Sequence, residues 1–323
     1  CEGKSMKLIM ENWNKFLKEQ EEVSAGGVTS SQVLKMSLPQ FVQALQSNRK
    51  DVIKSVLAGA KDGKEGDDAV SIEPVTVKCA DLRPTQSEVV FDKSIPFALE
   101  RPEKFMTYFR SDGPFKVGPP GNDAIVVLNN KFVLDGHHRW SSLFCVNPNA
   151  EMHAFNIKLP VSPINALKLM QASIMAYAGD VPSNKGGGIN LFTIDENTLT
   201  QQVYKILDEE PQLVPEYIRL GLLDGEGGLG GDPRDQAGGR SEKRKQEVAE
   251  RLLGIYGRNI DQMQANNKPV SGATSREPMP QTDAPSGSKV SAGGDTPAAL
   301  KPLEKGQIDF RSPFATDKKK AAE

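Results

Sequence analysis

The sequence predicts an α+β (mixed α/β) protein, in which a small sheet domain is flanked by helical segments and a disordered C-terminal tail. Between residues 71 and 160, short apolar runs typical of strands alternate with helical stretches. On both sides of this region, apolar residues recur at helical spacing. From residue 267 onward, Pro, Ser, Gly, Thr and Lys mix without periodicity, which is typical of disorder.

Length and charge limit the function. The 323 residues predict one or two compact domains with appended segments, and a hydrophobic content of 37% predicts that part of the chain is unfolded. The 40 Lys and Arg residues against 42 Asp and Glu give a net charge of -2. This balance excludes a positive field over the whole molecule, so nucleic-acid contact requires a local patch.

Apolar runs and cysteines indicate the compartment. No run approaches the roughly 18 apolar residues of a membrane span, and no leader is evident, so we expect a soluble, cytoplasmic protein. Cys1, Cys79 and Cys145 lack CxxC spacing, which predicts neither disulfides nor structural zinc, and a reducing compartment. Cys1 in place of an initiator methionine suggests a fragment, a processed product or a misplaced start, with Met6 a natural start.

The N-terminal region is expected to be helical. Residues 1–22 predict an amphipathic helix that packs on the body of the protein or, alternatively, docks on a partner or a membrane surface. Residues 23–70 predict a helical preface and linker. Its two helices lie between Ser30 and Ala60, with Pro39 starting the second, and a charged, Gly-rich linker follows at 61–68.

The sheet domain is expected over 71–160. Asn129-Asn130 predicts a hairpin turn, and the span from Phe91 to Pro120 is interpreted as a long insertion that contains one helix. The predicted strands are 74–77, 124–128, 131–134 and 151–159, and the predicted helices are 102–108 and 139–145.

Further helices are expected after the sheet domain. In the helical extension, 161–223, the helix at 163–178 has a wide apolar face that should cap the sheet, and short helices follow at 199–207 and 214–223. A Gly-rich linker at 224–240 precedes a helix at 241–266, which opens on Lys243-Arg244-Lys245. These positive charges disfavour a helix N-terminus unless an anion binds there. The disordered tail is expected over 267–323.

Chemistry is concentrated in the run Asp135-Gly136-His137-His138-Arg139, where an apolar strand meets a helix. Such a junction points backbone N–H groups outward, and Gly136 permits the close approach of an anion. Arg139 can bind phosphate oxygens through two donors, while the histidines can donate hydrogen bonds or exchange protons. The run therefore predicts a phosphate site.

Purely structural interpretations of the same run remain open. Asp135 would then cap the helix, and His137 and His138 would be half-buried polar residues. Metal binding by both histidines is disfavoured, because adjacent side chains point apart and no third ligand is evident. His153, on the following strand, is interpreted as structural.

The run resembles the signature of the ParB/sulfiredoxin-like superfamily in its DGHHR branch. The segment from Cys79 to Val89 is similar to the entry of ParB-like N-terminal domains, and the resemblance covers residues 72–160. It implies a nucleotide site whose loop binds phosphates. Members include CTP-hydrolysing DNA clamps, annotated nucleases, free-serine kinases and sulfiredoxin.

The resemblance also narrows the activity. His137 stands where sulfiredoxin needs a cysteine, and no clear helix-turn-helix follows Pro160, so sulfiredoxin chemistry is excluded and a clamp is disfavoured. The DGHHR form resembles the serine kinases, which implies an upstream glutamate base. Glu88 is the positional candidate, with a solvated loop carboxylate as the alternative, and Glu88 or Asp135 would act as base or bind Mg²⁺.

The expected function is therefore nucleotide-phosphate binding at the DGHHR loop, followed by nucleotide hydrolysis or phosphoryl transfer. The ligand is a nucleoside di- or triphosphate (ATP, ADP or CTP) with Mg²⁺, in a bacterial or phage-encoded protein. The catalytic candidates are Glu88, His137 and His138, and the candidates for nucleotide binding are Asp135, Gly136, His137, His138 and Arg139.

Two other classes stay as alternatives. One is a DNA-binding ParB-like nuclease or partition-type protein that uses Lys243-Arg244-Lys245 and the basic tail. The other is a non-enzymatic phage accessory or scaffold protein that binds a protein partner through the N-terminal helix or the C-terminal tail.

Overall fold

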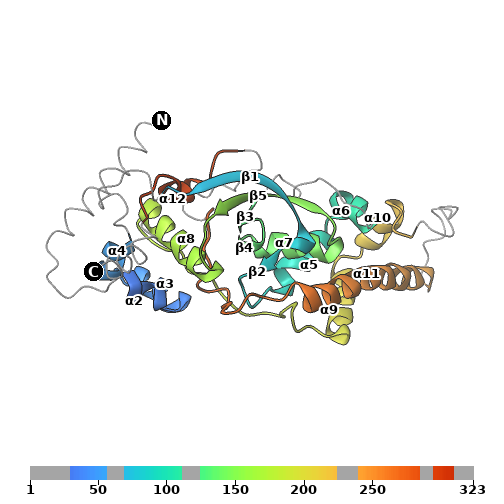
Figure 1. Cartoon of the computed structure of the whole chain (residues 1–323). Coiled ribbons are helices and arrows are strands. Elements are labelled where there is room, and N and C mark those ends of the chain that lie inside the picture. The colour runs from blue at the N-terminus through green and yellow to red at the C-terminus, as the bar shows by residue number, and fades with distance from the viewer. Residues whose placement is uncertain (1–29, 57–68, 111–123, 224–238, 284–293, 309–323) are drawn as a thin grey trace.

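A computed structural model describes residues 30–56, 69–110, 124–223, 239–283 and 294–308. A five-stranded mixed sheet lies between two groups of helices (Figure 1). The sheet order is β1-β5-β3-β4-β2. This arrangement confirms the mixed α/β class. The strands are β1 (Ser71–Lys78), β2 (Arg83–Pro84), β3 (Ile125–Leu128), β4 (Phe132–Asp135) and β5 (Glu151–Lys158).

The pairing of the strands places β4 next to a short edge strand. β5 pairs with β1 antiparallel and with β3 parallel, while β4 pairs with β3 antiparallel and with β2 parallel. Asn129 and Asn130 join β3 to β4 with φ values of 52° and 55°. Asparagine tolerates this left-handed backbone, which a two-residue hairpin turn requires, so the predicted turn is confirmed.

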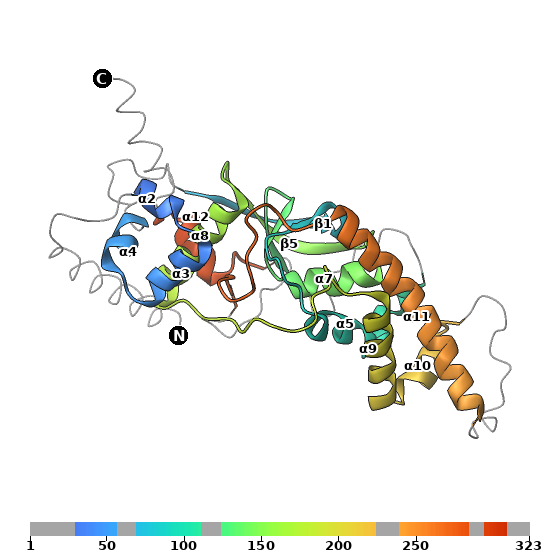
Figure 2. The same cartoon turned by 90° about the horizontal axis from the view of Figure 1, so that it is seen from below.

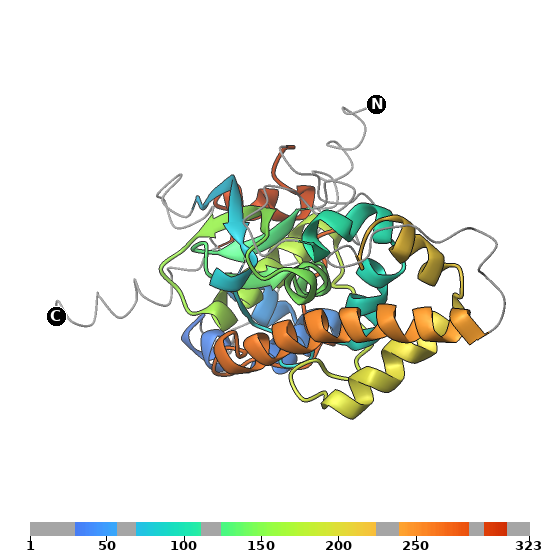
Figure 3. The same cartoon turned by 90° about the vertical axis from the view of Figure 1, so that its right-hand side faces the viewer.

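One face of the sheet packs on a helical layer that includes the helix after β4. Val127, Met152 and Ala154 point into this layer. Asn259 joins two of its helices, because its side-chain amide donates to the carbonyls of Cys145 and Val146. Figure 3 shows the longest helix, α11, running along this side. The layer contains α5 (Phe91–Leu99), α6 (Pro102–Phe109), α7 (His137–Val146), α9 (Glu196–Glu209), α10 (Leu213–Arg219) and α11 (Gly239–Asn266).

The other face packs on a second group of helices, which Figure 2 shows at the opposite end of the molecule from α9, α10 and α11. Val126, Leu128 and Ile157 point into this group. The buried Lys168 links two of its helices, because Nζ donates to the carbonyl of Leu34 at 2.6 Å. The group contains α2 (Ser30–Lys35), α3 (Leu38–Gln46), α4 (Lys50–Val56), α8 (Pro163–Ala178), η4 (Ala298–Leu300) and α12 (Lys301–Glu304).

Most predicted elements between 71 and 266 are present. Helix α8 has the predicted bounds and covers the sheet. Two expectations are wrong in detail: residues 30–56 form three helices rather than two, and the described part of the span from Phe91 contains two helices, α5 and α6, rather than one. α5 continues through Pro96, an interior position that disfavours a helix. The predicted amphipathic helix, the linker at 61–68 and residues 224–238 of the linker predicted at 224–240 lie outside the described residues, while residues 239 and 240 belong to α11.

The expected disorder from residue 267 onward is wrong for residues 267–283 and 294–308. Met279, Leu300 and Ile308 are buried in the second helical group. The first stretch has no helical or strand periodicity, and side chains from other elements hold its backbone instead. Gln171 donates to the carbonyl of Pro278 at 2.8 Å, and Asn184 donates to that of Met279 at 2.9 Å. Residues 309–323 lie outside the described part of the chain.

No helix among the described residues is both long enough and apolar enough to cross a bilayer.

Candidate functional site

A pocket of about 340 Å³ opens at the N-terminus of α7. Four parts of the chain that are distant in the sequence line it. The junction of β4 and α7 contributes residues 135–139, and Gln86 and Phe97 lie beside it. The third segment contributes Arg276, residues 279–281 and Asp283. Asn184 completes the lining. The DGHHR run is therefore brought together with a segment that was expected to be disordered.

Gly136 sets the geometry of the junction. Its φ is +89°, and a Cβ placed on it would lie 2.6 Å from Cγ2 of Ile125 and 3.1 Å from Nε of Arg139. Only glycine fits this backbone and this space. No side chain caps α7 at Gly136, so the N–H groups of the first turn and the positive end of the helix dipole face the pocket.

His137 is buried and holds the frame of the pocket. Only 4% of the residue is exposed, and its Nε2 accepts the backbone N–H of Thr85 at 3.2 Å. Burial lowers the pKa of His137 to about 3, so the imidazole is neutral near pH 7. A neutral ring that accepts at Nε2 carries its proton on Nδ1. Its Nε2 is therefore committed to positioning the start of α7 against the chain after β2.

His138 is less buried, but it is also neutral. Its Nε2 accepts the backbone N–H of Val90 at 3.4 Å. Burial lowers the pKa of His138 to about 3, and the positive charges of Arg276 and Lys93 add to the effect. The negative charge of Asp135 acts in the opposite direction but does not offset burial and the nearby cations.

Two guanidinium groups line the pocket without acidic partners. Neither Arg139 nor Arg276 forms an ion pair with any residue that the structure describes. Arg276 donates from Nη1 to the carbonyl of Lys185 at 2.9 Å, and burial lowers its pKa. Unpaired, partly desolvated cations favour an anion as their partner.

Asp135 binds the C-terminal segment and does not cap α7. Its Oδ2 accepts two hydrogen bonds from Thr282, one from the backbone N–H at 3.0 Å and one from Oγ1 at 2.6 Å. Thr282 is buried. These bonds hold one wall of the pocket against the end of β4.

Glu88 lies outside the pocket lining. A Cβ placed on Gly186 would lie 3.7 Å from Oε2 of Glu88 and 3.5 Å from Oε1 of Glu277, so the two carboxylates are neighbours. Asp135 and Asp283 are the carboxylates of the lining. Within the described ranges, no group of three or more His, Cys, Asp or Glu residues is arranged to hold a metal ion.

Sequence reasoning missed Arg276. The residue belongs to no motif, and its segment has neither helical nor strand periodicity. Its place in the pocket depends on the contact of Thr282 with Asp135, 147 positions away in the sequence. An apolar and proline cluster at 278–280, all buried, is the one local signal of a packed segment.

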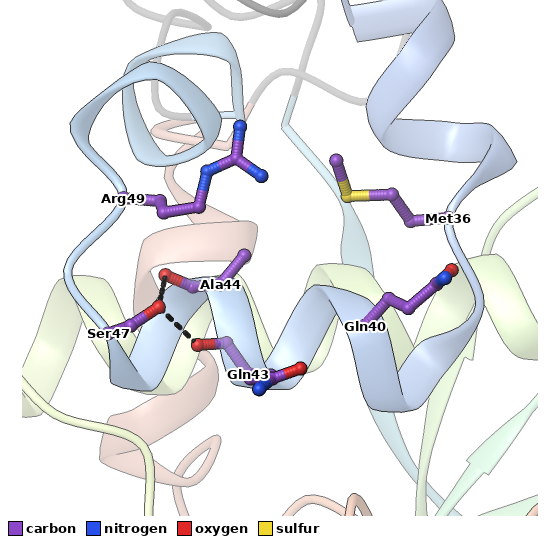
Figure 4. Close-up of a pocket in the computed structure, with 6 residues that line it drawn as sticks. All are labelled: Met36, Gln40, Gln43, Ala44, Ser47 and Arg49. Carbon is purple, nitrogen blue, oxygen red and sulfur yellow. Dashed lines mark hydrogen bonds between the residues drawn. The ribbon is translucent and has the colours of Figure 1, made fainter.

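A second pocket, of about 400 Å³, lies on α3 and the ends of α2 and α4 (Figure 4). Several of its polar groups already have partners within the chain. Ser47 donates to the carbonyl of Gln43 at 2.6 Å, and Arg49 pairs with Asp51 at 2.5 Å. Because Arg49, the charged residue of its lining, is already paired, this pocket is a weaker candidate for a ligand site than the pocket at α7.

Comparison with family models, curated proteins and solved structures gave no match. The fold and the pocket define a mixed α/β protein with a polar pocket at a helix N-terminus, lined by two arginines and two aspartates.

Proposed function

We propose that this chain is a ParB/sulfiredoxin-like protein that binds the phosphates of a nucleoside di- or triphosphate at the N-terminus of α7. One observation carries the proposal: Arg139, which has no ion pair within the described chain, lines a pocket beside the uncapped first turn of α7. Backbone N–H groups, a helix dipole and a guanidinium are the donors that phosphate oxygens favour.

The residues of the run take different roles in this proposal. Gly136 lets the backbone approach a phosphate, and Arg139 donates to its oxygens. His138, neutral at pH 7, hydrogen-bonds at the rim. Asp135 and His137 are positioning residues, because their hydrogen bonds go to Thr282 and Thr85.

The proposed chemistry is nucleotide hydrolysis or transfer of the terminal phosphoryl group to a hydroxyl, such as that of serine. The attacking oxygen bonds to the terminal phosphorus as its proton passes to a carboxylate, and the bond to the bridging oxygen breaks. Glu88 is the candidate base by resemblance. Because its carboxylate lies outside the pocket lining, beside Gly186, the acceptor would approach from that side. Mg²⁺ bound with a polyphosphate would neutralise part of the phosphate charge.

No observation favours the DNA-binding alternative. Each cation of the run 243–245 already has an acidic partner: Arg244 pairs with Glu247 at 2.9 Å, and Lys245 with Asp208 at 2.8 Å. Lys243 lies 3.9 Å from Glu247. The N-terminal helix of the scaffold alternative lies outside the described residues.

The test is a calorimetric titration of the full chain with ATP, ADP, CTP and GTP, with and without Mg²⁺, alongside assays for free phosphate and phosphoserine. Arg139→Ala should weaken binding at least about tenfold, because it removes charge-assisted hydrogen bonds. Arg251→Ala, an exposed arginine on α11 outside the pocket lining, is the matched control. Equal affinities in Arg139→Ala and the wild type would overturn the proposal.

A further inference from the structure

One wall of the pocket is a strap, defined here as residues 274–283, of which Arg276, 279–281 and Asp283 line the pocket. It contains no helix and no strand of more than one residue. Its backbone attaches to the body at both ends: Ser87 donates its N–H to the carbonyl of Thr274 at 2.8 Å, and Thr282 donates to Asp135. The strap therefore lies across the pocket between two fixed points.

Arg276 is the charged group that the strap brings to the pocket. Burial and the charge of Arg276 lower the pKa of Lys93, and both cations lower the pKa of His138, whereas the carboxylates of Asp135 and Asp283 line the same pocket. Glu277, next to it in sequence, is exposed and turns toward Gly186. Arg276 is thus a second arginine, besides Arg139, to which a ligand can bring a negatively charged group.

We infer that the strap supplies the second half of the anion site, and that Arg276 together with Arg139 selects ligands with two linked phosphoryl groups over those with one. This inference rests on the proposed function and adds a class of ligand to it. One phosphoryl group occupies the first turn of α7 beside Arg139, and the next one reaches Arg276. A single phosphate engages only the first of these positions.

Asp135 anchors the C-terminal end of the strap. The carboxylate of the DGHHR run does not touch the ligand in this arrangement, but fixes the chain that carries Arg276 through Thr282. A ligand that joins the two arginines adds a third attachment to the strap. Ligand binding and the ordering of the strap therefore stabilise each other.

The experiment compares inorganic pyrophosphate with inorganic phosphate by calorimetry in the full chain. Wild type should bind pyrophosphate at least about tenfold more tightly, which corresponds to one additional charge-assisted hydrogen bond. Arg276→Ala should reduce this ratio to near one while phosphate affinity stays the same, and Arg276→Lys should restore part of the ratio. In the same samples, pyrophosphate should slow amide hydrogen exchange over 274–283 in the wild type.

The outcomes separate the two proposals. A pyrophosphate preference that is unchanged in Arg276→Ala, with binding still lost in Arg139→Ala, would overturn the role of the strap and leave the phosphate site standing. No binding of phosphate, pyrophosphate or any nucleotide to the wild type would overturn both. Arg251→Ala, outside the pocket lining, should match the wild type for both probes.

Discussion

The carboxylate of Asp135, at the end of β4, accepts both the backbone N–H and the hydroxyl of Thr282, at 3.0 and 2.6 Å. One acidic side chain thereby fixes a segment that has almost no regular structure of its own. The first prediction follows from this pair.

Thr282→Val keeps the shape of the side chain and removes the hydroxyl donor. A hydrogen bond to a charged acceptor contributes about 1.5–3 kcal/mol, so the strap should open more often. Trypsin should then cleave after Arg276 at least about tenfold faster, while the cooperative unfolding of the body changes little. Thr274→Val, a hydroxyl that contacts only the neighbouring carbonyl of Ser275, is the control. Equal cleavage rates in Thr282→Val and wild type would contradict the anchoring role.

Gly136→Ala should destabilise the protein strongly. The positive φ alone costs about 1–2 kcal/mol for a residue with a Cβ, and the contact at 2.6 Å with Ile125 forces a backbone shift as well. Chemical denaturation measures the loss. Gly254→Ala is the matched control, because Gly254 is an exposed mid-helix position on α11 with open space around it. That variant should be stabilised by up to about 1 kcal/mol, and similar losses in both variants would refute the strain at Gly136.

The low pKa values of the buried His137 and the partly buried His138 predict that the protein is sensitive to acid. In the folded chain their pKa is about 3, against the ordinary 6.5, so the unfolded chain binds more protons between these values. The contribution of the two neutral histidines to the free energy of unfolding is present in full above about pH 6.5 and is lost as the pH falls toward 3. At pH 5 each histidine accounts for about 2 kcal/mol of the loss relative to pH 7. His137→Gln and His138→Gln should each flatten the dependence of the unfolding free energy on pH, and an unchanged slope in both would contradict the burial argument.

Lys168 predicts that the free energy of unfolding also depends on pH in the alkaline range. Burial lowers its pKa to about 8 from the usual 10.5, so the unfolded chain holds the extra proton between these values and stability rises as the pH rises through them. The difference in unfolding free energy between wild type and Lys168→Met isolates this residue from other groups that titrate at high pH. It should move in favour of the wild type by about 2 kcal/mol between pH 7 and 9.5. A difference that does not change with pH would show that the lysine is solvated.

The sheet and most of its helices follow from sequence because their signals are local. The apolar run at 125–128 and the asparagine turn define the hairpin, and the apolar face of 163–178 defines α8 with its bounds. The position of the DGHHR run at a strand-to-helix junction was likewise predicted and is confirmed.

The rest depends on contacts between distant residues. Nothing in the sequence near Arg276 shows that it lines the same pocket as Arg139, because the strap is held by side chains of α8, by Asn184 and by Asp135 rather than by its own periodicity. The same reason explains His137, whose burial depends on packing against the chain at Thr85. Glu88 was chosen by its order in the chain, and order alone does not fix which side of a pocket a carboxylate lies on.

Helices from outside the predicted sheet domain of 71–160 contribute to the cover of both faces of the sheet. α8 covers one face, and α11 packs on α7 over the other. A shortened gene product that stops at residue 160 would expose the apolar face of the sheet that α8 covers and the apolar side of α7 that α11 covers, and should therefore self-associate. A shortened version for expression or crystallisation should therefore be trimmed only before residue 30 and after residue 308, and should keep the whole range between them.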